Sequence, residues 1–135
     1  MNIQGKFPNT RLRRNRMKEF SRRLVAENNL SADDLILPLF VCEGNNVEDP
    51  IQSMPGVSRY SIDKLLHKVE EAVKLSIPAI AIFPQIEASL KNNEGSLAFD
   101  ENNLVCRSIK SIKKEFTHIG IICDVALDPF TDHGH

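Results

Sequence analysis

The sequence contains no long apolar segment and few cysteines. No apolar run approaches the roughly 18 residues that span a bilayer, and the first residues, Met1–Lys6, are polar, unlike an apolar secretion signal. These absences predict a soluble, cytoplasmic protein that does not bind membranes. The three cysteines, Cys42, Cys106 and Cys123, form neither a CxxC pair nor an even-numbered disulfide framework, so we expect reduced thiols and no structural zinc site.

The motifs of several large enzyme classes are also missing. The sequence has no GxGxxG, GxxxxGK[ST] or GxSxG pattern, which argues against dinucleotide-binding, P-loop and serine-hydrolase functions. A lysine that forms a Schiff base must be desolvated in a pocket. The lysines of this chain are predicted in the basic N-terminal segment, on polar helix faces or in a loop (Lys91), and none ends an apolar strand. The residues alone therefore identify no nucleophile.

Length and composition fit one globular domain. The chain has 135 residues, of which 41% are hydrophobic and 26% are charged, and both values are ordinary for a soluble domain. A closed eight-stranded α/β barrel needs roughly 250 residues. These residues are therefore too few for a complete barrel.

Charge is distributed unevenly along the chain. Residues 1–25 contain eight basic side chains and one acidic side chain, a charge of +7, and the formal net charge of −1 leaves −8 for the remainder. Phe20 and Leu24 belong to a sparse apolar stripe that predicts a helix from about Arg13 to Asn28.

The basic segment has four interpretations: an organelle-targeting peptide, a nucleic-acid arm, a solvated helix, or an arm that docks on an acidic surface of a partner subunit. It continues into the apolar stripe without a cleavable break, which disfavours targeting. Phe20 is the only aromatic residue within the dense basic stretch 11–23, and no glycine-rich or zinc module follows. We therefore favour the docking arm, keep the solvated helix open, and expect no nucleic-acid partner.

Three short apolar runs recur at a regular spacing. They cover residues 35–42, 77–83 and 119–125, and their starts are 42 residues apart. Continuous apolar runs of this length are typical of strands buried on both faces of a parallel sheet. Apolar residues at helical spacing follow Ser61, a good N-cap residue, and recur from Leu104. The pattern predicts an α/β fold, β-α-β-α-β, with right-handed crossovers.

Two features interrupt this pattern. Pro38 lies inside the first run, where a central strand would lose a ladder hydrogen bond, so we expect a bulge there or a strand that begins after it. The connections at residues 43–60 and 85–103 are long and polar. Loops of that length usually carry function or hold extra structure such as a hairpin.

The richest candidate site follows the third run. Parallel α/β sheets bind ligands beyond the carboxyl ends of their strands, and residues 124–135 place three carboxylates and two histidines there. Asp124 is the sharpest candidate, because a carboxylate inside an apolar strand is costly to bury without a partner. Its alternative is a strand-end acid bonded to a loop amide. Two interpretations account for Asp128, Asp132, His133 and His135: a divalent-metal site or a solvated polar loop. In a metal site, the oxygen ligands would suit magnesium and the imidazoles would suit zinc.

Five segments occur in an order that is hard to obtain by chance. They are RLRRNR, DDLILPLFV, SMPGV, GSLAF and DVALDPFTDHGH, beginning at residues 11, 33, 53, 95 and 124. Together they resemble the N-terminal part of porphobilinogen synthase, also called δ-aminolevulinic acid dehydratase, over about residues 10–135. The resemblance implies an N-terminal arm followed by a TIM (β/α)8 barrel. Residues 1–30 would be the basic arm with its helix, and residues 31–135 the first three strands and two helices of an incomplete barrel.

The resemblance also implies an activity and partners. Enzymes of this family condense two 5-aminolevulinate molecules into porphobilinogen, in tetrapyrrole and haem biosynthesis. Their arm wraps a neighbouring subunit of a homo-oligomer. The family's two Schiff-base lysines, its substrate carboxylate-binding residues and its allosteric magnesium ligand lie further along and have no counterpart in this chain. We therefore expect an N-terminal fragment that is inactive alone.

Individual residues carry over from the family motif. Asp124 matches a strand-end aspartate that assists proton transfers at the active site. Asp128 and Ala126 fall where zinc-dependent members place cysteines, so the resemblance implies the aspartate-bearing, magnesium-responsive subtype, with magnesium at Asp128 and zinc disfavoured. His133 and His135 match family histidines, to which we assign no metal.

Two other functions remain open. The first is that of a non-catalytic module, formed by the arm and the partial sheet, that binds other subunits. The second is a nucleic-acid-binding fragment that uses the basic segment. An incomplete parallel sheet leaves both edge strands unpaired, which predicts a partner or self-association.

Overall fold

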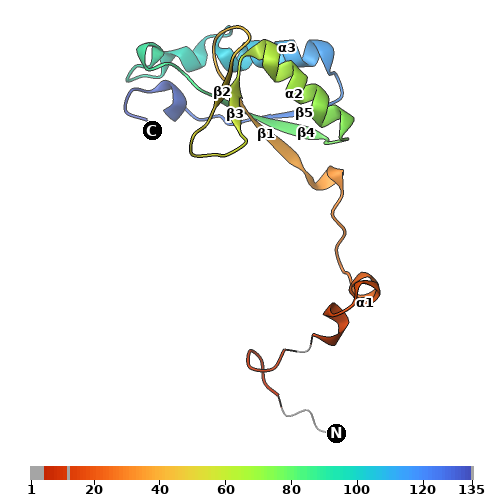
Figure 1. Ribbon diagram of the computed structural model, residues 1–135. Coiled ribbons are helices and arrows are strands. Elements are labelled where there is room, and N and C mark those ends of the chain that lie inside the picture. Colours follow the sequence, from red (N-terminus) through yellow and green to blue (C-terminus); the bar gives the residue numbers. More distant parts are fainter. Residues whose placement is uncertain (1–4, 12, 135) are drawn as a thin grey trace. The chain divides into compact units, whose positions relative to one another are not determined.

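The computed structural model describes residues 5–11 and 13–134 (Figure 1). Contacts within the chain divide it into two compact units, Met1–Leu30 and Ser31–His135. None of the helices in the described residues is long and apolar enough to cross a membrane.

Helical structure in the first unit is short. A one-turn 3₁₀ helix spans Arg14–Arg16, and helix α1 spans Glu19–Leu24. The predicted helix from Arg13 to Asn28 is therefore wrong in extent, because Lys18 between the two segments is extended (φ −118°, ψ 147°). No residue of α1 is buried. A six-residue helix with no buried residue gains too little from its few backbone hydrogen bonds to grow longer.

A five-stranded sheet forms the centre of the second unit (Figure 1). Its strand order is β2-β3-β1-β4-β5. Strands β3, β1, β4 and β5 are mutually parallel, and β2 is antiparallel to β3. The three predicted strands correspond to β1, β4 and β5, which confirms the α/β fold. The strands are β1 (Ile36–Val41), β2 (Glu48–Pro50), β3 (Ser58–Tyr60), β4 (Ala79–Pro84) and β5 (Gly120–Cys123).

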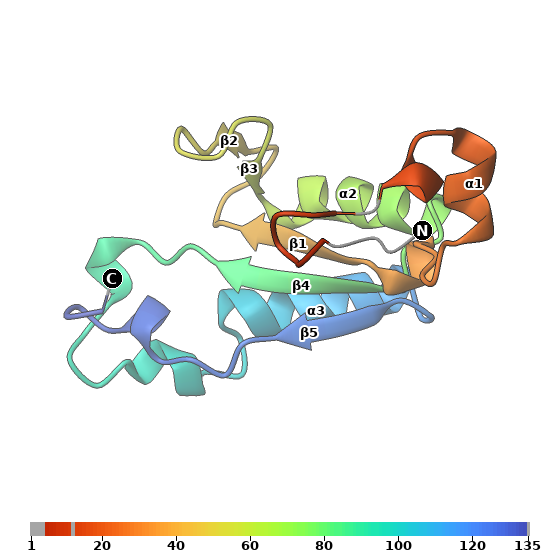
Figure 2. The same cartoon turned by 90° about the horizontal axis from the view of Figure 1, so that it is seen from below.

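Two helices cover one face of this sheet. Helix α2 spans Ile62–Lys74 and α3 spans Leu104–Glu115, and Figure 2 shows both behind β1, β4 and β5. Their apolar stripes bury residues of β1 and β4 in one core. Each such leucine, valine or isoleucine contributes about 1.5–3 kcal/mol when buried. Fully buried members include Val41, Leu65, Val69, Ile80 and Ile112.

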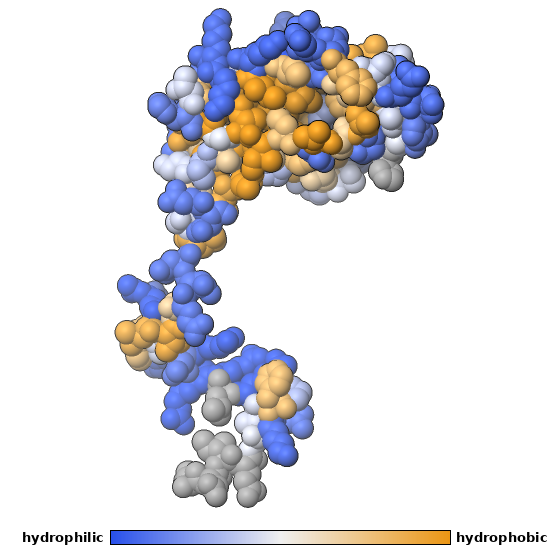
Figure 3. Space-filling view, turned by 180° about the vertical axis from the view of Figure 1, so that it is seen from behind, coloured by the Kyte–Doolittle hydropathy of each residue, from blue (hydrophilic) through white to orange (hydrophobic). Residues whose placement is uncertain are grey.

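The other face of the sheet is apolar and is not covered by any described element of the second unit. Side chains alternate along a strand, so the neighbours of the buried residues point away from the helices. Ile36, Phe83 and Ile122 are 54%, 37% and 47% exposed. Apolar side chains also gather at the surface of the second unit in Figure 3. The second unit therefore has one packed and one unpacked sheet face.

Strand β1 runs straight through Pro38. A capping box of Ser31 and Asp34 begins the 3₁₀ turn before the strand. Residues 36–41 then pair with β4 without interruption, Pro38 opposite Ala81, so neither a bulge nor a later start occurs. Strand β3 reaches only the last two residues of β1. Pro38 is tolerated because the other side of β1 has no ladder partner at that level.

The loop after β1 contains the β2–β3 hairpin, one of the structures that its length predicts. Ser61 and Asp63 hold its first part against α2. The Val47 N–H donates to Ser61 Oγ (2.9 Å), and the Asn46 N–H donates to Asp63 Oδ2 (2.9 Å). Ser61 Oγ also donates to Asp63 Oδ1 (2.6 Å). Ser61 thus occupies the predicted N-cap position, yet its hydroxyl bonds the loop and Asp63, not a helix N–H.

Candidate functional site

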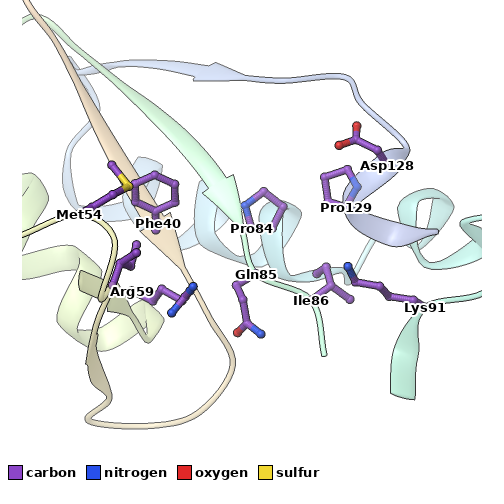
Figure 4. A pocket seen from close by; sticks show the side chains of 10 residues that line it. Phe40, Met54, Arg59, Pro84, Gln85, Ile86, Lys91, Asp128 and Pro129 are labelled. Atoms are coloured by element: carbon purple, nitrogen blue, oxygen red, sulfur yellow. The ribbon is translucent and has the colours of Figure 1, made fainter. Parts of the chain in front are cut away.

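A pocket of about 460 Å³ lies where β1 and β4 end (Figure 4). Residues of β1 and β3 form one part of it, and the loops after β4 and β5 form the other. This is the carboxyl edge of the parallel strands, where α/β sheets bind ligands. The polar side chains that line it are Arg59, Gln85, Lys91 and Asp128.

Strand β3 places Arg59 in the pocket. Arg59 lies in register with Phe40 of β1 on one side and with Asp49 of β2 on the other. Its Nη1 donates to Asp49 Oδ2 at 2.9 Å, and the Arg59 side chain is 32% exposed. Opposite charges on paired strands stabilise their register. The ion pair orients the guanidinium, whose other N–H groups remain free to donate, since an arginine has five.

The loop after β4 contributes Lys91. Asn92, the next residue, forms a parallel bridge with Thr131. The Asn92 N–H donates to the Phe130 carbonyl (3.3 Å), and the Asp132 N–H donates to the Asn92 carbonyl (3.2 Å). These bonds join the loop after β4 to the loop after β5. Lys91 is half-buried and makes no ion pair within 4.0 Å among the described residues.

Apolar side chains form the rest of the pocket wall. The rings of Phe40 and Phe83, which are paired across β1 and β4, lie 5.7 Å apart between centroids with a tilt of 33°. Gln85 follows β4, and its N–H donates to the Val41 carbonyl (2.8 Å). This surface suits the hydrocarbon part of a small ligand. The apolar lining residues are Phe40, Ile51, Met54, Pro84, Ile86 and Pro129.

Asp124 lies just beyond β5 and is exposed. The expectation that it is inside an apolar strand is wrong, because β5 ends at Cys123, which pairs with Ile82 of β4. Because Asp124 lies past the end of the strand, its carboxylate stays hydrated and needs no buried partner. The alternative, a bond to a loop amide, is not seen among the described residues either. Asp124 lies at the predicted edge of the sheet but does not line the pocket.

Asp128 does line the pocket, at the start of a one-turn 3₁₀ helix, Asp128–Phe130. Asp132 accepts a contact from His133 Nδ1 at 3.3 Å, with both side chains exposed. His135 lies outside the described residues. Within the described ranges, no three His, Cys, Asp or Glu side chains are close enough to hold a metal ion. These residues do not form a complete metal centre, and magnesium at Asp128 stays a prediction.

None of the three cysteines lines the pocket. Cys42 is buried, and Cys106 and Cys123 are partly buried. Burial raises the pKa of the Cys42 thiol, with a smaller contribution from the charge of Asp49. Burial also raises the pKa of Cys123. Both groups are therefore protonated thiols at neutral pH, the form that makes a poor nucleophile and a poor metal ligand.

The pattern of the sequence does not predict how the two loops form this pocket. The sequence pattern placed Lys91 in a loop and gave it no role. In the structure, Asn92 Oδ1 accepts the N–H groups of Glu94 (3.2 Å) and Ser96 (3.0 Å). Gly95 follows at φ +60°. The Asn-Asn-Glu-Gly sequence at residues 92–95 is the only local signal for the turn, because such residues favour turns. No local sequence signal indicates the bridge between Asn92 and Thr131.

The fold and pocket together define a class of protein. Parallel strands joined by helices, helices on one face, an apolar opposite face and a polar pocket at the carboxyl edge are the features of the wall of an α/β-barrel enzyme. The sequence profile of the family described as delta-aminolevulinic acid dehydratase matches residues 9–135. The chain belongs to the delta-aminolevulinic acid dehydratase family.

Individual relatives agree with this assignment. The delta-aminolevulinic acid dehydratase of Bradyrhizobium diazoefficiens is 57% identical over 125 residues, which cover 93% of this chain and 35% of the relative. That of Chlamydia pneumoniae is 46% identical, covering 93% and 38%. The crystal structure of delta-aminolevulinic acid dehydratase (porphobilinogen synthase) from Toxoplasma gondii ME49, in complex with the reaction product porphobilinogen, superimposes with a TM-score of 0.85 at 39% identity, covering 93% of this chain and 36% of that one. The chain thus spans little more than a third of the length of these relatives.

Proposed function

We propose that this chain supplies the N-terminal arm and the first barrel strands of a cytoplasmic porphobilinogen synthase. The reaction joins two 5-aminolevulinate molecules into porphobilinogen with loss of two water molecules, in tetrapyrrole and haem biosynthesis. The match to the family profile over residues 9–135 carries this proposal. The pocket at the carboxyl edge of β1 and β4 supports it, because barrel enzymes bind their substrates at that edge.

Asp124 is the residue that we propose takes part in catalysis. The condensation requires protons to leave carbon and nitrogen atoms of the substrates and to reach the departing oxygens. A carboxylate at the end of β5 can accept such a proton and return it. We propose no metal-dependent step, because the pocket itself offers one carboxylate, that of Asp128. A magnesium ion at Asp128 would need ligands beyond the described residues. We also propose the non-zinc subtype because of Asp128.

The chain alone is proposed to lack activity. A Schiff-base lysine needs a desolvated, neutral amine. Lys91 lines the pocket, but it lies on a loop and is only half-buried. The lysines that the family uses therefore have to come from outside these 135 residues.

The first unit is proposed to dock on another subunit of a homo-oligomer. Its basic side chains give residues 1–25 a charge of +7 against −8 for the remainder of the chain. Phe20 and Leu24 of α1 are 64% and 80% exposed, so an apolar surface accompanies the charge. Opposite charge speeds and orients the encounter, and burial of the apolar side chains stabilises the contact.

A second candidate function is a non-catalytic module that binds other subunits. The uncovered apolar face of the sheet favours it, because such a face is suited to contact with protein. Co-purification with a longer synthase chain, without any effect on that chain's porphobilinogen formation, would support this function over the first.

A chimera tests the proposed function. The matching segment of the Bradyrhizobium diazoefficiens relative is replaced by this chain, and porphobilinogen formation is measured. Because the two segments are 57% identical, we expect the chimera to form product at a rate within about tenfold of the parent, a difference of about 1.4 kcal/mol in the barrier. A chimera that folds and assembles like the parent but forms no product contradicts the proposal.

A further inference from the structure

We propose that Cys106 and Cys123 form a reversible disulfide when the chain meets a small-molecule disulfide such as oxidised glutathione. Cys106 lies in the first turn of α3, and Cys123 is the last residue of β5. Both are free thiols and partly buried in the structure. This modification site is independent of the catalytic role given to Asp124.

Strand β5 directs the Cys123 side chain toward the helices. Cys123 is in register with Ile82 of β4, and in-register side chains on neighbouring strands point to the same face of a sheet. Ile82 is buried in the core between the sheet and the helices. Ile121, two residues earlier on β5, also packs against this core. The Cys123 thiol therefore lies on the face of the sheet that α3 covers.

Helix α3 begins at the same end of the sheet. The chain passes from the carboxyl end of β4 through α3 to the start of β5, and β4 and β5 are parallel. The helix therefore runs antiparallel to both strands, and Figure 2 shows it alongside them. Its first turn, with Cys106, lies at the carboxyl ends of the strands, where β5 ends at Cys123.

The rotation of α3 turns Cys106 toward β5. Leu104 and Ser108 are buried against the sheet. Arg107 forms an ion pair with Glu43, which follows β1, so this flank of the helix faces β1. Neighbouring helix residues are about 100° apart, which places Cys106 on the opposite flank. The strand order β1-β4-β5 puts β5 on that side.

The electrostatics of the thiols agree with this pairing. The pKa of Cys123 is raised by burial and, to a smaller extent, by the charge of Cys106. Two groups must lie near each other for such an effect, because the Coulomb interaction weakens with distance. The pKa of Cys42 is instead raised by burial and by the charge of Asp49. Cys106 is therefore the partner that the structure offers to Cys123.

The exchange takes two steps and consumes one small disulfide. The thiolate of one cysteine attacks a sulfur of oxidised glutathione, the S–S bond breaks, and one glutathione thiolate leaves. The second cysteine thiolate attacks the mixed disulfide, forms the bond between Cys106 and Cys123, and releases the other glutathione. The two cysteines lose two electrons, which glutathione gains, and their two protons pass to the glutathione thiolates. The new bond joins the start of α3 to the end of β5.

The test equilibrates the 135-residue chain with mixtures of reduced and oxidised glutathione at mildly alkaline pH, with and without denaturing urea. Remaining thiols are then alkylated, and unreduced peptides are mapped by mass spectrometry. Because the fold holds the two thiols together, we expect the ratio of disulfide to dithiol to be at least about tenfold higher in the folded chain than in urea. Cys106→Ser and Cys123→Ser should each abolish the bond. Cys42→Ala, the matched control, should leave it unchanged.

Mixing isotopically labelled and unlabelled chains separates bonds within one chain from bonds between chains. A bond between Cys106 and Cys123 of the same chain, favoured by folding and unaffected by Cys42→Ala, supports the proposal. Equal ratios in the folded and unfolded chain, bonds to Cys42 in equal yield, bonds between chains only, or no bond overturn it. An inactive chimera would leave this result unchanged, so failure of this site and failure of the proposed function are distinguishable.

Discussion

Asp63 connects the first turn of α2 to the loop that follows β1. The Ser61 hydroxyl donates to its carboxylate and lowers the pKa of Asp63, and the Asn46 N–H adds to the effect. A carboxyl group whose pKa is lower in the folded chain stabilises the fold above its unfolded pKa, about 3.9. That stability is lost as the pH falls through the folded pKa.

We therefore expect urea-unfolding midpoints to fall as the pH is lowered below about 4, the pKa of an unfolded aspartate, and to fall less in Asp63→Asn. Chemical denaturation at a series of pH values between neutral and acidic measures this. Asp132→Asn, at an exposed loop position, is the control. If Asp63→Asn and Asp132→Asn show the same pH dependence, the hydrogen bonds to Asp63 do not contribute.

Asp124 is the residue on which the catalytic proposal depends. Replacing it by asparagine in the chimera removes the proton acceptor and keeps the size of the side chain. Loss of a general base lowers kcat by about 10²–10⁴-fold, whereas Asp132→Asn, in the same loop region but outside the pocket lining, should change kcat little. Steady-state kinetics measure both. Equal kcat for the Asp124→Asn chimera and its parent would remove Asp124 from the mechanism.

At the scale of elements, two loops form the site and a glycine permits their contact. Gly95 has φ +60°, and a Cβ there would lie 3.2 Å from Thr131 Cγ2 and 3.6 Å from Phe130 Cβ. Phe130 is buried in the core. The loop after β4 therefore approaches the loop after β5 so closely at Gly95 that there is too little room for a side chain.

Gly95→Ala should lower the free energy of unfolding by more than Gly56→Ala. Both glycines have a positive φ, so each substitution carries about 1–2 kcal/mol of backbone strain. Only Gly95 adds a close contact, because nothing lies within 4 Å of a Cβ at Gly56. Denaturation curves of the two variants measure the difference. Equal destabilisation would mean that the two loops separate at little cost.

The elements also show what a sequence can predict. Strands β1, β4 and β5 and helices α2 and α3 were predictable, because their apolar residues repeat with the period of a buried strand or an amphipathic helix. The length of α1 was not predictable in this way. Phe20 and Leu24 have helical spacing in the sequence, but the helix has only six residues and none of them is buried. The end of β5 before Asp124 depends on its pairing with β4, which a local pattern does not specify.

The candidate site was predictable in its place but not in its members. The rule that parallel strands bind ligands at their carboxyl ends predicts a site at the edge where this pocket lies. The candidates predicted from the sequence include Asp128, which lines the pocket, but not Arg59 or Lys91, which also line it. Arg59 reaches the pocket through the pairing of β3 with β1, and Lys91 through the bridge of Asn92 to Thr131. Such contacts between distant residues leave no periodic signal.

At the scale of the second unit, the uncovered sheet face sets the behaviour of the chain in solution. Exposed Ile36, Phe83 and Ile122 share this face. Exposed apolar faces of this kind drive association. The described residues therefore predict self-association of the isolated chain.

Ile122→Lys should weaken that association. Replacing a contact isoleucine removes about 1.5–3 kcal/mol of burial, which raises the dissociation constant by at least about tenfold. Leu75→Lys is the control, because Leu75 is also exposed (68%) but follows α2 at its C-terminal end. Sedimentation velocity over a concentration series measures the effect. Equal behaviour of the two variants would place the association elsewhere.

The central claim concerns the whole molecule: the chain provides the arm, the strand-end aspartate and part of the barrel wall, while the remaining synthase residues complete the enzyme. The most direct measurement is porphobilinogen formation from 5-aminolevulinate, assayed side by side for the purified 135-residue chain and for the chimera. We predict no product from the chain and sustained product from the chimera. Product from the chain alone, or a folded and assembled chimera that forms none, would contradict the claim.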